Sequence, residues 1–527
     1  MGIGERAARL LREAPDETVA IEHDGTQWSW GRLRRCADAV GDAVRGAGIE
    51  PGTRVGLVLE NRPEHVAAFA ALLAGAWCAV VVDPLQPAGR LREDLGRAEV
   101  PVVIGAAEQL AAAGAPGVIA LGRDGSARLC GTPAEAKAED PGAAFEMSTS
   151  GTTGTPKRIP IRHGQVDWAL ASASRPSGTD ALLLPSASVI ASPLAHIGGL
   201  WGLVHALHTG RRIVLMTKFA VDPWVEAVER HRVRAAFLVP AALRDILASE
   251  VPPERLRSLK LVTSGSTVLP AELADRFFRR YGVRVLMTYG ATEFAGAVAG
   301  WTYALHEQWW DRKAGSAGRA YPGVQLRVTD DLGREVPPDC AGRLEVRTAQ
   351  SAHGARDWVR TSDLARIDED GFLWSMGRAD DVITRGGFTV RPDTVERALE
   401  RHPAVREAAV TGVPDERLGA VPVAAVELER GQSPPAAEEL IAWCRKELLP
   451  YELPERVVLV DALPRTPSAK VSRVALAELV RAAPPDETPI PDDTEGSRHE
   501  HDFAPRSDRA ARLHREHGHR GRLAAGD

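Results

Sequence analysis

The chain is poor in cysteine and carries little net charge, and each shortage excludes a class of protein. Five cysteines are spread over 527 residues without a Cys-x-x-Cys pair. This disfavours a disulfide scaffold or a cysteine-rich zinc site and predicts a reduced, cytoplasmic compartment. A net charge of −6 offers no basic surface for nucleic acid or for an anionic membrane.

Long apolar runs are also missing. The uncharged run from Val66 to Val82 has 17 residues and contains Gly75, whereas a helix that crosses a bilayer needs about 20 residues. We therefore predict a buried helix followed by a buried strand at this place. Residues Met1 to Arg12 are charged and amphipathic, and they lack the apolar core of a signal peptide. The sequence thus predicts no membrane partner.

What is present is an ordinary soluble composition, with 44% hydrophobic and 26% charged residues, in a chain too long for one core. Segments of strand and helix character alternate, which predicts an α/β fold with mostly parallel sheets. The clearest are strands 212–216, 235–239, 259–263 and 283–287 and helices 223–231, 241–249 and 270–281. From Ser316 to Trp374, short strands with glycine and proline turns predict an antiparallel or barrel-like subdomain. A smaller α+β unit follows Asp380.

The most informative stretch is 148–157, which reads Ser-Thr-Ser-Gly-Thr-Thr-Gly-Thr-Pro-Lys. Its two glycines allow backbone N–H groups to converge on one point, and its hydroxyl groups can donate to phosphate oxygens. Lys157 adds a positive charge. Pro156 stands where the common P-loop has its second glycine, so this is a different polyphosphate-binding loop. The alternative, a flexible linker, is disfavoured by Pro156-Lys157 and the apolar segment that follows.

Four further segments carry side chains suited to a nucleotide. Tyr289 to Glu293 follows a predicted strand and offers an aromatic face, a hydroxyl and a carboxylate for a metal. Asp363 could accept hydrogen bonds from ribose hydroxyls. Gly377 to Asp381 is a charged cluster at the end of the large unit, and Pro464 to Lys470 places a lysine on a proline-braced loop. Taken singly, each also fits an ordinary structural residue, a linker or a surface lysine.

Together and in this order, these segments resemble the adenylate-forming superfamily, which includes acyl-CoA synthetases, adenylation domains of peptide synthetases and luciferases. The resemblance covers roughly residues 10 to 480. Thr149 to Lys157 matches T-S-G-T-T-G-x-P-K in full, and residues 289–293 and 377–381 match Y-G-x-T-E and G-R-x-D-D. Pro193 to His196 resembles P-L-x-H, and residues 315–319 resemble G-S-x-G-R.

The resemblance implies an AMP-binding N-terminal domain, residues 1–379, and a mobile C-terminal domain, residues 380–482, hinged at Asp380. Residues 483–527 are poor in apolar side chains, so we predict a disordered tail. Five of the fifteen histidines lie in this tail, which leaves metal binding open as an alternative to a solvated segment.

The implied chemistry has two steps: a carboxylate attacks the α-phosphorus of ATP to give acyl-AMP and pyrophosphate, and the thiol of CoA or of carrier-protein phosphopantetheine then displaces AMP. The family pattern assigns catalysis to Lys470, Thr292, Glu293 and His196, and Mg²⁺ to Glu293 and Thr152. The implied nucleotide-binding residues are Thr149, Ser150, Gly151, Thr152, Thr153, Gly154, Lys157, Tyr289, Thr292, Asp363 and Arg378. The implied acyl pocket is His196, Gly265, Ser266 and Gly290, and the implied thiol tunnel is Gly386 and Gly387.

Some positions depart from the family pattern. Ser362 replaces the glycine of T-G-D, Ala469 replaces the glycine before Lys470, and residues 264–270 replace S-G-G-A-P-L-P. Residues 191–196 lack the aspartate that pairs with an α-amino group, so an amino acid substrate is disfavoured. An acyl-CoA ligase acting on a small acid is the leading interpretation. A stand-alone enzyme that loads an acyl carrier protein, a member recruited to nitrite or an amine acceptor, and a non-catalytic nucleotide-binding protein are the alternatives.

Overall fold

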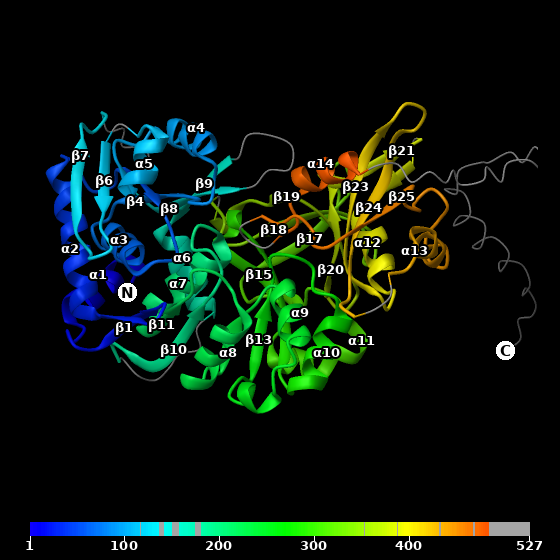
Figure 1. The fold of residues 1–527 in the computed structure, drawn as a ribbon, viewed down its shortest axis with the longest axis horizontal. Helices are drawn as coiled ribbons and strands as arrows, with labels where there is room; N and C mark the ends of the chain where they lie inside the picture. Colours follow the sequence, from blue (N-terminus) through cyan, green and yellow to red (C-terminus); the bar gives the residue numbers. More distant parts are fainter. Residues whose placement is uncertain are drawn as a thin grey trace, which may run out of the picture. The chain divides into compact units, whose positions relative to one another are not determined.

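The computed structural model describes residues 1–115, 117–135, 142–149, 157–173, 181–352, 354–386, 388–431, 434–466 and 470–483 (Figure 1). Residues 1–483 form one compact unit, and 484–527 are a separate unit outside the described residues. The predicted disordered tail therefore lies outside the description, except for Ala483. So do residues 150–156 of the glycine-rich stretch, Gly387 and residues 467–469.

A seven-stranded sheet occupies the N-terminal third of the chain. Its order is β7 (Ala127–Gly131), β6 (Gly117–Leu121), β5 (Val103–Gly105), β3 (Arg54–Val58), β4 (Cys78–Val82), β8 (Ala143–Thr149) and β9 (Lys157–Arg162). The five inner strands are parallel, and the edge strands β7 and β9 run antiparallel to their neighbours. The sheet is the α/β arrangement that the alternating pattern predicts.

Both faces of this sheet are covered, as β4 illustrates. Ala79 and Val81 belong to the core with α2 (Trp30–Gly46) and α3 (Pro63–Ala74). Val80 and Val82 belong to a second core with α4 (Ala88–Ala98) and α5 (Ala107–Ala113). Successive strand residues point to opposite faces, so a continuous apolar run serves two cores. The run from 66 to 82 is thus a buried helix and a buried strand, as predicted, and no helix in the described part of the chain is long and apolar enough to cross a membrane.

A second, four-stranded sheet joins the N-terminus to the middle of the chain. Its order is β10 (Leu184–Ile190), β11 (Arg211–Leu215), β1 (Val19–His23) and β2 (Thr26–Ser29). The helices α1 (Ile3–Glu13), α6 (His163–Ala173) and α7 (Ile197–Thr209) contribute to the large N-terminal core. The first residue of α1 is tied by the Ile3 N–H, which donates to Asp167 Oδ1 at 2.7 Å.

The third sheet carries much of the candidate site. Its order is β12 (Ala235–Phe237), β13 (Leu261–Ser264), β14 (Arg284–Ala291), β15 (Gly296–Gly300) and β16 (Arg319–Ala320). It packs with α8 (Val221–Arg230), α9 (Pro240–Ala248) and α10 (Ala271–Tyr281), and α11 (Tyr303–Lys313) follows β15. The predicted strands and helices of this region are confirmed to within two residues, with one exception. Strand β14 continues to Ala291, so the expected loop 289–293 is largely strand.

An antiparallel sheet follows, in the order β17 (Gln325–Thr329), β18 (Gly342–Arg347), β19 (Val359–Ile367) and β20 (Leu373–Arg378). The predicted antiparallel character is confirmed. Strand β19 was not among the expected strands, because its residues alternate between apolar and polar only near its end. It places Asp363 opposite Arg378 of β20 in the register of the sheet.

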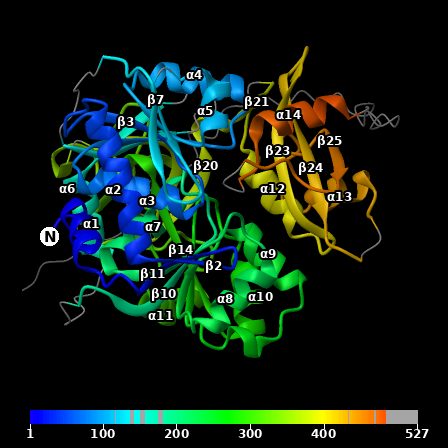
Figure 2. The ribbon, with the colours of Figure 1, turned by 60° about the vertical axis from the view of Figure 1, so that its left-hand side comes forward.

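The C-terminal part of the compact unit contains a five-stranded sheet, drawn in yellow and orange in Figures 1 and 2. Its strands are β22 (Phe388–Val390), β21 (Ile383–Arg385), β24 (Gly419–Leu428), β23 (Val405–Asp415) and β25 (Arg456–Val460). Alternate residues of β23 and β24 face α12 (Pro392–Glu400) and α13 (Ala437–Cys444), and the others face α14 (Arg473–Ala482). This part therefore has helices on both faces. The helix α14 is an addition to the expected elements.

A buried ion pair crosses the first sheet and provides a test of its energetics. Arg54 of β3 makes two hydrogen bonds of 2.8 Å to the carboxylate of Glu146 on β8, with β4 between them. We expect Arg54→Leu to lower the free energy of unfolding by about 3 kcal/mol, because it leaves a buried carboxylate without its partner. The double variant Arg54→Leu/Glu146→Leu should cost less, since it removes both charges. Urea unfolding of the two variants checks this, and a double variant at least as unstable as Arg54→Leu would contradict it.

Candidate active site

One large cavity, of about 2390 Å³, brings together side chains from distant parts of the sequence. It is lined by His196 before α7, Glu293 after β14, Asp363 of β19, Arg378 of β20 and Lys470 of the C-terminal part. Sites for a single small molecule usually occupy 300–1,000 Å³. The cavity therefore has room for a nucleotide together with a second substrate.

Tyr289 and Asp363 are joined by a short hydrogen bond in the cavity. The Tyr289 hydroxyl donates to Asp363 Oδ2 at 2.5 Å, and the Asp363 N–H donates to Thr361 Oγ1 at 3.1 Å. Burial and the neighbouring Asp363 carboxylate raise the pKa of Tyr289, so the phenol stays protonated and remains a donor. The residues expected at the base and at the ribose of a nucleotide are thus adjacent.

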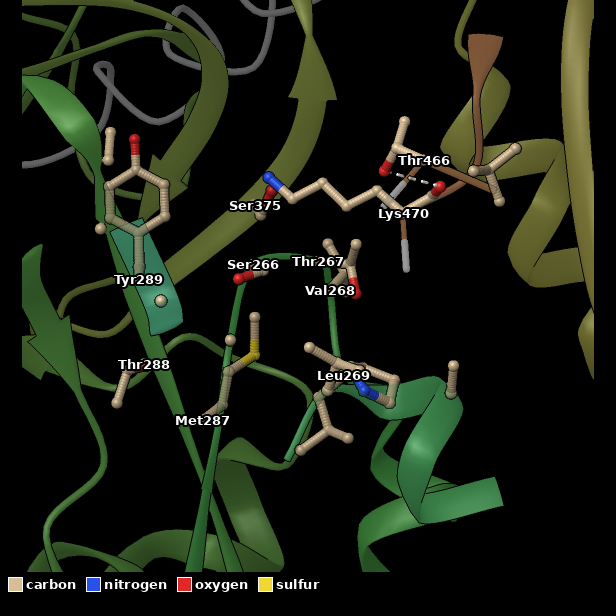
Figure 3. Close-up of a pocket in the computed structure, with 18 of the residues that line it drawn as sticks. Ser266, Thr267, Val268, Leu269, Met287, Thr288, Tyr289, Ser375, Thr466 and Lys470 are labelled. Atoms are coloured by element: carbon tan, nitrogen blue, oxygen red, sulfur yellow. Dashed lines mark hydrogen bonds between the residues drawn. The ribbon is translucent and has the colours of Figure 1, made fainter. Parts of the chain in front are cut away.

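Lys470 extends from a short loop toward Tyr289, above Ser266 and Thr267 (Figure 3). Burial, and secondarily Arg378, lower the pKa of Lys470, while Asp363 and Glu293 act in the opposite direction and favour its charged form. The base of the loop is closed by the Thr466 N–H, which donates to the Lys470 carbonyl at 2.7 Å. One ammonium group is therefore placed among two carboxylates and a guanidinium.

His196 caps the N-terminus of α7, and its Nε2 lies 3.5 Å from Asp83 Oδ2. Burial lowers the pKa of His196, and Lys470 lowers it further, while Asp83 raises it. The loop before His196 is fixed by buried Asn61, which accepts from the Leu194 N–H at 2.7 Å and donates to the carbonyls of Ser192 and Met216. His196 is thus a half-buried imidazole at the cavity wall, directly after a loop that Asn61 holds in place.

The strands that flank the glycine-rich stretch are antiparallel partners, with Thr149 opposite Lys157 and Ser148 opposite Arg158. Arg158 Nη2 lies 2.6 Å from Asp94 Oδ1, so β9 is tied to α4 by a buried pair. The expected phosphate-binding residues Ser150, Gly151, Thr152, Thr153 and Gly154 lie outside the described residues, as does the side chain of Thr149. Lys157 begins β9 and is not among the described residues that line the cavity.

The two glycines expected in the acyl pocket lie where neighbouring atoms leave little room for a side chain. A Cβ at Gly290 would lie 2.2 Å from the Gly296 carbonyl oxygen, and a Cβ at Gly265 would lie 2.8 Å from Thr288 Oγ1. Both glycines line the cavity, with Ser266 and Thr292. Gly386 belongs to the turn after β21 and is not a described lining residue, and the side chain of Asp380 and all of Gly387 are outside the description.

The structure adds site residues that the motifs did not indicate. These are Asp83, Asn61, Trp201 and Phe237. Asp83 directly follows β4, and a polar residue at the carboxyl end of a parallel strand is a recognisable signal. The aromatic residues carry no such signal, because their sequence surroundings resemble any buried helix or strand.

Ser266 has φ +73°, in the left-handed region that favours glycine. This conformation costs an L-residue about 1–2 kcal/mol, part of which glycine loses again as chain entropy. We expect Ser266→Gly to stabilise the protein by roughly 0.5–1 kcal/mol and Ser266→Ala to give no gain, because alanine keeps the Cβ. Thermal unfolding compares the two, and equal stability changes would contradict the strain.

Comparison with known proteins gives consistent results. The model described as AMP-binding enzyme matches residues 6–354, and the model described as AMP-binding enzyme C-terminal domain matches residues 394–470. An indoleacetate–CoA ligase of Aromatoleum aromaticum is 35% identical over 346 residues, which are 63% of this chain and 66% of that protein. A feruloyl-CoA synthase of Amycolatopsis is 32% identical over 89% of this chain and 97% of its own length.

Among solved structures, an amide bond synthetase from Marinactinospora thermotolerans is 28% identical, with a TM-score of 0.75 over 90% of this chain and 99% of that chain. The fold is therefore the one predicted, with a large N-terminal domain and a small C-terminal domain. The ordered motifs, the cavity they line and the two matching family models agree: this chain belongs to the AMP-binding enzyme family, the adenylate-forming ligases.

Proposed function

We propose that this protein activates an aromatic carboxylic acid with ATP, forming acyl-AMP and pyrophosphate, and then transfers the acyl group to the thiol of CoA. The observation that carries the proposal is the position of Lys470, from the C-terminal part, in one cavity with Glu293, Asp363 and Arg378. An ammonium group there can neutralise two anions that must meet.

In the first step a carboxylate oxygen of the acid attacks the α-phosphorus of ATP, and pyrophosphate leaves. Both reactants are anions and repel each other, so a positive group between them lowers the barrier. Lys470 supplies this charge. Thr292 contacts the α-phosphate. His196, kept neutral by burial, lines the acyl end of the site without adding a charge.

Asp363 and Arg378 hold the ribose, and Tyr289 lies against the base. Their spacing supports this, since Asp363 and Arg378 are opposite each other in the sheet and Tyr289 is hydrogen-bonded to Asp363. The hydroxyl groups of the glycine-rich stretch, with Lys157, take the outer phosphates. The antiparallel pairing of Thr149 with Lys157 brings both ends of that stretch together.

Glu293 and Thr152 are the proposed protein ligands of Mg²⁺. Among the described residues there is no group of three or more acidic, histidine or cysteine side chains that could enclose a metal. The carboxylate of Glu293 and the hydroxyl of Thr152 fit an ion whose remaining ligands are substrate phosphates and water. When bound, the ion would neutralise phosphate charge.

The second step needs a different arrangement, because the thiol must reach the acyl carbon where Lys470 stood. The C-terminal domain turns about Asp380 and brings Gly386 and Gly387 toward the thiol. The thiolate sulfur attacks the acyl carbon, the bond to AMP breaks, and AMP leaves. The supporting feature is the turn of β21–β22, which presents Gly386 with φ +55° on an exposed hairpin.

The lining of the acyl end favours a flat aromatic group. Trp201, Phe237 and Met287 line the cavity there. A Cβ at Gly198 would lie 3.6 Å from the Phe237 ring, and one at Gly296 would lie 3.6 Å from the Trp201 ring. Both rings thus pack close to glycine backbone and present apolar aromatic surface to the cavity, and two relatives are named for aryl acids.

Lys470→Ala should lower the rate of acid-dependent pyrophosphate release by about two orders of magnitude or more, the usual effect of losing one preorganised charge. Lys446→Ala, which changes an exposed lysine of the C-terminal part, is the matched control and should leave the rate unchanged. Unimpaired release by the Lys470 variant would refute the assignment.

A panel of acids tests the substrate class. Arylacetic and cinnamic acids should give kcat/KM values about tenfold or more above those of octanoate, because a ring packs against Trp201 and Phe237. They should also exceed those of phenylalanine, because residues 191–196 offer no carboxylate for its α-amino group. Phe237→Leu should raise KM for the aromatic acid and leave KM for ATP unchanged. Supplying CoA, a phosphopantetheinylated carrier protein or an amine then identifies the acceptor by its consumption of acyl-AMP. Faster turnover of octanoate or phenylalanine would contradict the proposal.

A further inference from the structure

The loop that carries Lys470 is tied to the sheet of the C-terminal part by a second cation. Arg465 and Val471 form an isolated antiparallel bridge, and the Ser472 N–H donates to the Pro464 carbonyl at 2.8 Å. Arg465 Nη2 lies 2.5 Å from Glu407 Oε2, on β23. Glu407 is therefore linked through Arg465 to the base of the lysine loop.

The same carboxylate is contacted from the large domain. Arg244 of α9 places Nη1 3.1 Å from Glu407 Oε2 and Nη2 3.5 Å from Glu400 Oε1. Burial and the nearby carboxylate of Glu407 raise the pKa of Glu400 to about 7, although Arg244 acts against this shift. Near neutral pH Glu400 carries only part of its charge, so Glu407 is the main partner of Arg244.

A second ion pair joins α9 to β23 through the residues adjacent to Arg244 and Glu407. Arg406 of β23 places Nη2 2.5 Å from Asp245 of α9 and Nη1 3.0 Å from Glu427 of β24. Arg244 and Glu407 expose only 12% and 13% of their side chains, whereas Arg406 and Asp245 expose 15% and 44%. A third crossing pair, Arg276 with Glu429, is 55% and 28% exposed. Buried pairs resist screening by water and salt, so the pair of Arg244 with Glu407 carries most of the electrostatic weight and that of Arg406 with Asp245 adds a smaller part.

We propose that Arg244, with Asp245, is a positioning residue for the first half-reaction: it docks the C-terminal domain through Glu407 and Arg406 and so delivers Lys470 to the cavity. This rests on the proposed two-step function, in which the docked arrangement serves adenylate formation and is left before thioester formation. Arg244 touches no reacting atom. It acts through Glu407, Arg465 and the loop of Lys470.

The test separates the two half-reactions. With the best acid of the panel, Arg244→Ala should lower the rate of pyrophosphate release about tenfold, a typical size for coupling between two sites. CoA thioester formation from chemically synthesised acyl-AMP should stay within twofold of the unsubstituted protein. Arg244→Lys should recover part of the first rate, because an ammonium keeps the charge but cannot bridge two carboxylates as the guanidinium fork does.

Arg276→Ala is the matched control, since it removes an arginine that crosses to the same sheet at an exposed site, and it should change neither half-reaction. Asp245→Asn changes the other α9 residue of the proposed contact, the partner of Arg406, and should lower pyrophosphate release at least twofold. Because asparagine keeps the shape of the side chain, this variant separates a docking defect from a folding defect in Arg244→Ala. Equal loss in both half-reactions, no loss in the first, or the same loss in Arg276→Ala would overturn the proposal.

A measurement without turnover distinguishes failure of this inference from failure of the proposed function. In hydrogen exchange of the substrate-free protein, peptides from α9 and from the loop 463–466 should exchange faster in Arg244→Ala than in Arg276→Ala. If pyrophosphate release were absent from the unsubstituted protein with every acid, the proposed function would fail. The docking role would still stand on this difference, and identical exchange in the two variants would refute it.

Discussion

The arrangement of the site depends on bringing one ammonium group, that of Lys470, into a cavity built by another part of the chain. The cavity supplies two carboxylates, Glu293 and Asp363, and one guanidinium, Arg378, around the position that the lysine takes. Burial opposes a charge there, and the carboxylates favour it. Each supporting feature serves this balance: β19 and β20 hold Asp363 opposite Arg378, and the closed base of the loop at Thr466 aims the lysine.

Much of the fold was predictable because local patterns and tertiary packing agree. The buried run from 66 to 82 reads as a helix and a strand, and the structure contains both. The alternating elements between 212 and 287 are confirmed because each buried strand is short and is separated from the next by a helix of clear period. The motif residues Tyr289, Asp363, Arg378 and Lys470 meet in one cavity, although up to 181 positions separate them along the sequence.

What the sequence did not indicate arises from contacts between distant segments. Tyr289 was expected in a loop, yet it lies on β14, because pairing with β15 extends the strand past the point where the apolar pattern ends. Strand β19 has a mixed pattern of apolar and polar residues, so only its pairing with β18 and β20 identifies it as a strand. The partner of His196, Asp83, and the arginine–glutamate network of Arg244 have no local signature, since each residue alone reads as a solvated charge.

Glu407 is shared between two arginines, one within its own domain and one across the cleft. In the proposed domain movement, Arg244 would return to water while Glu407 keeps Arg465 as a partner. Glu407 is then not left without a partner, and Glu400, whose pKa burial raises to about 7, can take up a proton. The penalty for opening a buried salt bridge is thereby reduced. The contact between Arg244 and Glu407 could therefore form and break reversibly in each proposed catalytic cycle.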